Sequence, residues 1–150
     1  MNIREYLRIH DIEWFPIHIR IENSKKVPER VEGYEDGKEW VDSWKPTKDQ
    51  IAHMKTFDHV CNAIVIDTHT VHQLDVDVPS VFSMIIQKSG PWYRSFTKKL
   101  PHAFYTSNNA PTEPIGKYRI PCVETLTGRW AFAPSDAIVY NFDIKIPVYE

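Results

Sequence analysis

The sequence has few of the residues that mark specialised protein classes. It contains 2 cysteines, Cys61 and Cys122, which are too few for a disulfide-rich secreted framework and too far apart for a zinc knuckle. We therefore expect buried thiols in a reducing compartment. No apolar run approaches the length that spans a membrane, and the charged N-terminal segment lacks a signal-peptide core. These absences predict a soluble, intracellular protein without a membrane partner.

A large excess of either charge is also missing. The chain has 18 Lys and Arg against 20 Asp and Glu, for a formal net charge of -2. Contact with nucleic acid would therefore depend on a local basic patch. With 150 residues, of which 42% are hydrophobic, the chain can bury one core but is too short for two ordinary domains. We expect one domain over residues 1–150.

Hydrophobic periodicity predicts an α+β domain. After a short helical start, residues 14–21 read as a β-branched and aromatic strand, in which Pro16 suggests a sheet edge. Residues 22–46 are rich in charge, Gly and Pro and predict a long loop. Thr47 then resembles the N-cap of a helix that ends near His59.

The rest of the chain predicts further strands and one more helix. Strands at 62–68 and 71–78 are separated by only two residues, which predicts a hairpin. Pro79 opens a helix that stops at Gly90. Its expected apolar face consists of Val81, Met84, Ile85 and Ile86. Later strands are expected at 102–107, 120–127, 129–133 and 137–140. This order suits helices packed on one face of a largely antiparallel sheet.

The most informative tripeptide is Asp75-Val76-Asp77, near the end of an expected strand. Because side chains alternate between faces, Gln73, Asp75 and Asp77 share one face, while Leu74 and Val76 belong to an apolar face that we assign to the core. Two carboxylates about 7 Å apart along a strand repel each other unless a cation lies between them. Mg²⁺ and Mn²⁺ prefer such oxygen ligands. The pair predicts a metal site; the alternative is a solvated turn.

A basic segment and a histidine follow in SFTKKLPHAFY. Thr97, Lys98 and Lys99 offer a hydroxyl and two ammonium groups, and His102 opens the next apolar strand. Lysine binds phosphate as a point charge, and a strand-borne histidine can donate to a phosphate oxygen. This combination predicts nucleotide binding. The alternative is a solvated turn followed by a hydrogen-bonded core histidine.

A third acid, Glu124, lies in a strand that runs into Gly128 and turns back through Arg129 and Trp130. Arg129 and Trp130 could contact a phosphate and a base. The alternatives are an ordinary surface carboxylate and a core tryptophan, and we also expect Trp92 in the core.

The succession of these motifs resembles the archaeo-eukaryotic primase superfamily. LDVDV, KKLPHAFY and an acid followed by LTGRWAF are similar to its three motifs, above all in the primase-polymerase domains of large DNA viruses that precede a superfamily 3 helicase. The resemblance implies that Asp75, Asp77 and Glu124 are catalytic metal ligands and that His102 binds the nucleotide triphosphate. Leu100 stands where many members have Ser.

The resemblance also implies a fold and an activity. The fold would be a modified palm of the RNA-recognition type with a small N-terminal αβ part. The activity would be template-directed nucleotidyl transfer by a DNA primase or polymerase with two Mg²⁺ or Mn²⁺ ions. Partners would be NTP or dNTP, a single-stranded DNA template and a helicase domain in a longer chain, at a viral replication site in the host cytoplasm or nucleus.

Two other functions fit the same residues. A non-catalytic nucleic-acid-binding palm could serve template or origin recognition with vestigial acids. A metal-dependent nuclease also uses clustered acids, but no E-x-K triplet follows the acid pair. Metal-dependent nucleotide binding and DNA cleavage assays would separate the three.

Overall fold

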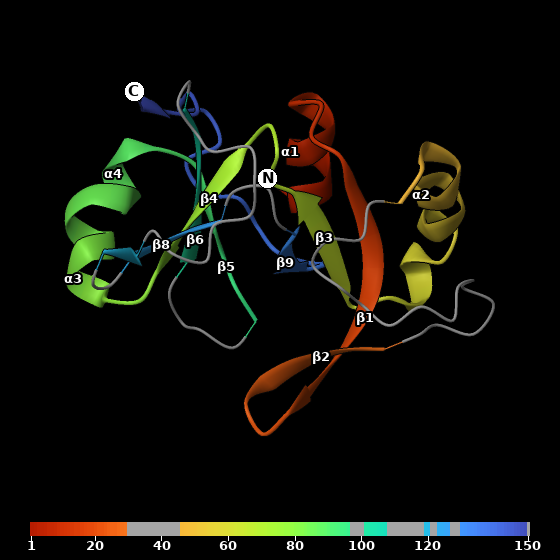
Figure 1. Ribbon diagram of the computed structural model, residues 1–150. Helices are drawn as coiled ribbons and strands as arrows, with labels where there is room; N and C mark the ends of the chain where they lie inside the picture. The colour runs from red at the N-terminus through yellow and green to blue at the C-terminus, as the bar shows by residue number, and fades with distance from the viewer. Residues whose placement is uncertain (30–45, 97–100, 108–118, 121–122, 127–129, 150) are drawn as a thin grey trace.

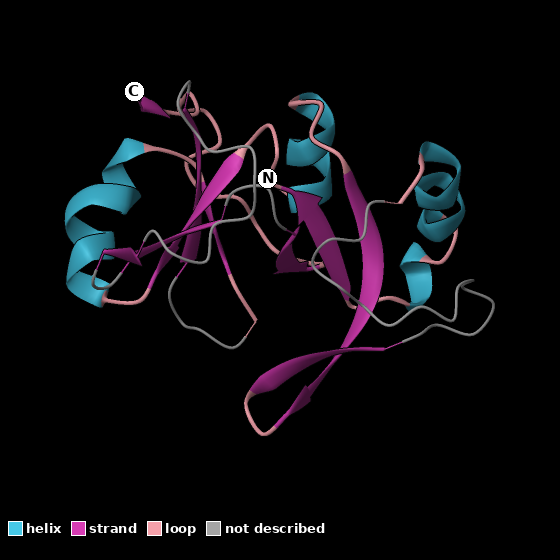
Figure 2. Ribbon diagram, viewed as in Figure 1, coloured by secondary structure: helices cyan, strands magenta, loops and turns pink. Residues whose placement is uncertain are grey.

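The computed structural model describes residues 1–29, 46–96, 101–107, 119–120, 123–126 and 130–149. Over these residues the fold is α+β, as expected, with antiparallel pairing dominant (Figures 1 and 2). The described strands divide between two sheets, which differs from the expected single sheet. No helix in the described ranges is both long and apolar enough to cross a membrane.

The first sheet has the strand order β2-β1-β3-β9. Its strands are antiparallel and comprise β1 (Trp14–Glu22), β2 (Lys25–Glu29), β3 (Ala63–Asp67) and β9 (Trp130–Pro134). β1 lies inside this sheet, so the predicted edge is wrong for the strand as a whole. Pro16, however, lies in the part of β1 that pairs with β3, and pairing with β2 begins only at His18.

The second sheet has the order β10-β6-β4-β8-β7, and β5 also pairs with β6. Its strands are β4 (His72–Val76), β5 (Trp92–Arg94), β6 (Pro101–Ser107), β7 (Arg119–Ile120), β8 (Val123–Leu126) and β10 (Val148–Tyr149). β10 pairs with β6 in parallel, whereas the other described pairs are antiparallel. The predicted strand at 120–127 is thus replaced by two short strands.

The predicted hairpin between 62–68 and 71–78 is wrong. β3 pairs with β1 and β9, whereas β4 pairs with β6 and β8. Both strands are buried over most of their length, so each can be the centre of its own sheet. The short connection between them carries the chain from one sheet to the other. Similarly, the predicted turn at Gly128 is wrong as a hairpin, because β8 pairs with β4 and β9 pairs with β3.

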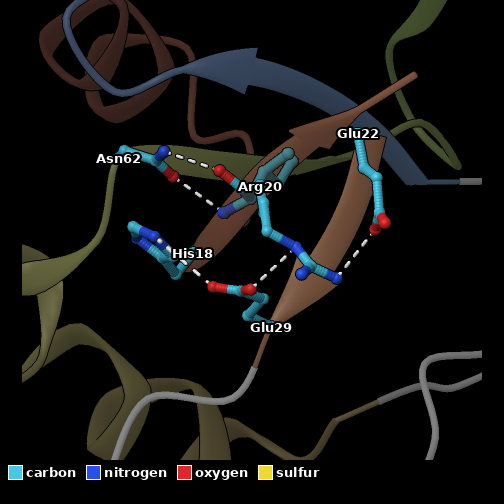
Figure 3. A network of polar contacts seen from close by, with 6 residues as sticks. His18, Arg20, Glu22, Glu29 and Asn62 are labelled. Atoms are coloured by element: carbon cyan, nitrogen blue, oxygen red, sulfur yellow. Dashed lines mark hydrogen bonds and ion pairs between the residues drawn. The ribbon is translucent and has the colours of Figure 1, made fainter. Parts of the chain in front are cut away.

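The predicted loop at 22–46 contains an unforeseen strand, β2. Asn23 and Ser24 have φ values of 51° and 63°, as the turn of a tight hairpin requires. β2 then pairs with β1 from His18 to Glu22, and the side chains of His18 and Arg20 contact Glu29 across the two strands (Figure 3). The sequence did not indicate this strand, because it contains charged residues and a proline. It lies largely outside the core and faces polar residues, so it needs no apolar pattern.

The helix that we expected after Thr47 is confirmed. α2 (Lys48–Lys55) begins with a capping box in which the Thr47 hydroxyl accepts from the Gln50 amide and the Gln50 side chain accepts from the Thr47 amide. It ends at Lys55, and a short 3-10 turn, η1 (Asp58–Val60), follows.

The helix that follows Val78 is also confirmed, but its predicted apolar face is partly wrong. It consists of α3 (Pro79–Val81), the π-helical η2 (Phe82–Ile86) and α4 (Gln87–Ser89). Val81 and Phe82 pack against the second sheet, whereas Met84 is 75% exposed. A π-turn bonds residue i to i+5, so the spacing of an α-helix no longer returns to one face. The side chains of Ile85 and Ile86 lie outside the description.

Three buried clusters position these layers. The largest lies between the two sheets and includes residues of α1 (Ile3–Ile9), β3, β5, β6 and β9. A second joins α2 to the other face of the first sheet, and a third joins α3 and η2 to the other face of the second sheet. α2 and the α3-α4 segment therefore lie on opposite sides of the molecule, with α1 between them (Figure 1). Trp92 belongs to the third cluster, as expected.

Candidate functional site

Two of the predicted acids and the predicted histidine fall on one row of the second sheet. The register pairs Asp75 of β4 with His102 of β6 on one side and with Glu124 of β8 on the other. Directly opposite residues of antiparallel strands have Cα atoms about 4.5–5.5 Å apart. Residues from three separate motifs are therefore neighbours in the folded chain, although the side chain of Glu124 lies outside the described part.

Asp75 and His102 are in contact and buried. His102 Nε2 lies 3.4 Å from Asp75 Oδ1, and the two side chains are 4% and 10% exposed. Contact between a carboxylate and an imidazole in a low-dielectric environment is electrostatically stronger than the same contact in water. The pair is thus a fixed polar element in a mainly apolar interior.

Tyr93 extends the row on the far side of His102. It pairs with His102 across β5 and β6, its hydroxyl oxygen lies 3.0 Å from His102 Nδ1, and it is completely buried. The rings meet edge to face at 5.3 Å. Burial, reinforced by the charge of Asp75, raises the pKa of the Tyr93 hydroxyl well above its usual value. Tyr93 therefore keeps its proton at neutral pH.

The two aspartates have different environments. Asp75 lies in β4 and is 7% exposed, whereas Asp77 lies just beyond the end of β4 and is exposed. The acidic face of β4 is buried as well as the apolar face, because Val71 and Gln73 are buried together with Asp75. The reason is tertiary: Val71 joins the cluster between the two sheets, so both faces of β4 are covered.

The opposite face of the same sheet carries a second polar group. Tyr105 pairs with His72 across β6 and β4, and its hydroxyl donates to Thr125 Oγ1 at 3.3 Å. His72 Nδ1 lies 3.1 Å from the Thr68 carbonyl oxygen, and burial lowers the pKa of His72. Because successive side chains alternate in a strand, this group is separated from the Tyr93, His102 and Asp75 row by the sheet itself.

The remaining predicted contacts are not located. Thr97, Lys98, Lys99 and Arg129 lie outside the described residues, as does Cys122. Cys61 is a buried free thiol, as expected, and burial raises its pKa to about 11. The basic part of the predicted nucleotide site therefore stays a prediction.

A divalent cation suits the donors on the row by type. Asp75, with Glu124 opposite it in register and Asp77 two residues further along, offers carboxylate oxygens, which Mg²⁺ and Mn²⁺ prefer. The described side chains alone contain no group of three His, Cys, Asp or Glu that could hold a metal ion. A set of three carboxylates on this row would therefore include Glu124.

Sequence reasoning missed Tyr93. Its strand, β5, is only three residues long, too short for a period of two to be recognised. The available signal was the apolar pair Trp92-Tyr93 directly after Gly90-Pro91, where the preceding helix had to end. That signal indicates a buried segment but not its partner strand.

A scan against models of known protein families finds no match to this chain, and a search of curated proteins finds no similar protein. The resemblance of the motifs to the primase superfamily stays a prediction.

Proposed function

We propose that the chain is a nucleotidyl-transfer domain of the archaeo-eukaryotic primase type, which joins nucleotides on a DNA template with the help of Mg²⁺ or Mn²⁺. One observation supports this most: the register aligns His102, Asp75 and Glu124 across three adjacent strands. The three residues come from distant parts of the chain and from three separate motifs, and the register makes them neighbours.

In this proposal Asp75, Asp77 and Glu124 hold the cations. The bound cations would supply positive charge for the attacking 3′-hydroxyl and for the leaving pyrophosphate. The 3′-oxygen forms a bond to the α-phosphorus, the bond from that phosphorus to pyrophosphate breaks, and the hydroxyl proton passes to solvent. His102 would donate from its ring to a non-bridging phosphate oxygen, helped by Thr97, Lys98, Lys99 and Arg129.

The difference in exposure between Asp75 and Asp77 suggests from which end of β4 a nucleotide would approach the row. Asp75 is buried, and Asp77 at the end of the strand is exposed. A charged triphosphate would therefore reach the row from the Asp77 end, where water already solvates a carboxylate. Placing the reacting phosphate next to Asp75 would then move it into a drier environment, in which charge interactions are stronger.

Burial also favours a second candidate, a nucleic-acid-binding palm without catalysis. His102 and Asp75 contact each other and are almost inaccessible, as the members of a structural hydrogen-bond network would be. In that case the row stabilises the sheet, and binding occurs elsewhere on the surface.

The deciding experiment is synthesis by the purified chain on single-stranded DNA with NTP or dNTP and either metal. The double variant Asp75→Asn, Asp77→Asn should lose at least about 100-fold in dinucleotide synthesis and primer extension. Mutation of a residue that only supports a metal ligand typically costs roughly 10- to 100-fold, and loss of the ligands themselves should cost at least as much. Asn keeps the size of each side chain, so thermal melting should show that the fold survives.

Asp143→Asn is the matched control, because Asp143 is an exposed acid remote from β4 in the sequence, and it should retain full activity. Equal activity of the double variant and the wild type would refute the site. If nucleotide or DNA binds equally well with and without metal, and no synthesis occurs, the binding module is the correct function.

A further inference from the structure

Tyr93 has no part in the site as derived from sequence, yet its contact with His102 is the best-defined one on the row. The phenol is completely buried, and its oxygen lies 3.0 Å from His102 Nδ1. On the other side of the same ring, Nε2 lies 3.4 Å from Asp75 Oδ1. The imidazole is thus held at both nitrogens by two different strands.

The chemistry of the three groups favours one direction for these contacts. A carboxylate only accepts hydrogen bonds, so Asp75 suits the imidazole tautomer that carries its proton on Nε2. In that tautomer Nδ1 is an acceptor, and the Tyr93 hydroxyl is the donor that suits it. The order of donors would then run from Tyr93 to His102 to Asp75.

We infer that Tyr93 is a positioning residue, whose hydroxyl holds the His102 ring so that the Nε2 proton faces the acidic row. Rotation of the ring about its bond to Cβ would break both contacts. The donor nitrogen therefore already faces the acidic row, beside which the nucleotide would bind if the proposed function is correct. Such support from a neighbouring group reduces the ordering that a ligand must induce on binding.

The sheet offers a matched control. Tyr105 is also a buried tyrosine of this sheet with a hydrogen-bonded hydroxyl, but it lies on the opposite face, next to His72. Tyr93→Phe and Tyr105→Phe each remove one buried phenol oxygen with little change in volume. Only the first should alter His102.

The primary test is nuclear magnetic resonance of the histidine rings in the full chain, because it requires no activity. The chain has 7 histidines, so the signals of His102 are assigned by comparison with His102→Gln. We expect the wild-type ring to be protonated at Nε2, with Nδ1 as a hydrogen-bonded acceptor. In Tyr93→Phe the Nδ1 resonance should move toward that of an unbonded acceptor, and in Tyr105→Phe it should not move.

A wild-type ring protonated at Nδ1 overturns the inference, and this result does not depend on the folding of any variant. So does a His102 spectrum that is the same in Tyr93→Phe and the wild type. The outcome is independent of whether the chain synthesises nucleic acid, so failure of the proposed function and failure of this inference are distinguishable.

A second measurement tests whether the His102 ring contributes to nucleotide binding. If the chain synthesises dinucleotides, Tyr93→Phe should raise the KM for nucleotide by about 2- to 12-fold, the range that one hydrogen bond supports, with kcat nearly unchanged. Tyr105→Phe should change neither constant. An unchanged KM in Tyr93→Phe, or an equal effect of both variants, contradicts a positioning role.

Discussion

Two histidine-carboxylate pairs of similar length lie in very different surroundings. On the hairpin of β1 and β2, His18 Nε2 lies 3.7 Å from Glu29 Oε2, and the side chains are 37% and 36% exposed. On the second sheet, His102 and Asp75 approach to 3.4 Å with 4% and 10% exposure. The groups are chemically alike, so burial is the main difference between them.

That difference decides what each pair can do. At the exposed pair, water solvates either partner if the other is removed, and Arg20 provides a further partner for Glu29 at 3.0 Å (Figure 3). At the buried pair, loss of one partner leaves the other in a medium that cannot replace it. The hairpin charges therefore act mainly as a solvated surface, whereas the buried row requires its members together.

The largest expected effect is at the buried pair. His102→Ala should lower the free energy of unfolding by about 2–4 kcal/mol, because it removes packing against Tyr93 and deprives both Tyr93 and Asp75 of a contact. Urea denaturation measures the change, and His18→Ala is the control. Similar losses in the two variants would show that burial does not separate the pairs.

An intermediate effect is expected within the hairpin region itself. The Asn62 side chain donates to the Ile19 carbonyl oxygen at 2.7 Å and accepts from the Ile19 amide at 2.8 Å (Figure 3). Asn62→Ala should cost about 1–2 kcal/mol, since two backbone groups of β1 lose their partner. In urea denaturation, Asn62→Ala should therefore lower the free energy of unfolding more than Glu29→Gln does. A larger loss in Glu29→Gln would contradict the comparison.

The smallest effect is expected from Glu29→Gln. The variant removes the charge that faces His18 and Arg20, but all three side chains are partly solvated, so stability should change by no more than about 0.5 kcal/mol. The difference from wild type should shrink further when thermal melting is repeated at about 1 M salt, where charges are screened within about 3 Å. A loss above about 1 kcal/mol that persists in salt would assign this network a structural role.

Sequence patterns predicted which segments are helices and strands better than they predicted pairing. β3, β4 and β6 lie where we expected strands, because runs of apolar β-formers indicate burial locally. The hairpin of β3 and β4 was wrong, because a strand buried on both faces accepts partners on either edge without a change in pattern. Met84 was expected on the apolar face because that prediction used α-helical spacing. A π-turn changes this spacing, and composition does not indicate where such a turn occurs.

The candidate site divides in the same way. The local sequence motifs single out Asp75, His102 and Glu124, and the strand register makes them neighbours. Tyr93 escaped notice because its importance depends on one hydroxyl that meets one ring nitrogen across two strands. No spacing along the chain encodes that contact.

The sequence by itself determined the features that depend on residues a few positions apart, such as the capping box of Thr47 and Gln50, the apolar strands and the acids that stand out within one of them. Only the tertiary structure decided that β3 and β4 belong to different sheets and that Tyr93, His102 and Asp75 form one buried row. The physical reason is that strand pairing and burial follow from the packing of the whole chain, which local preferences restrict but do not select.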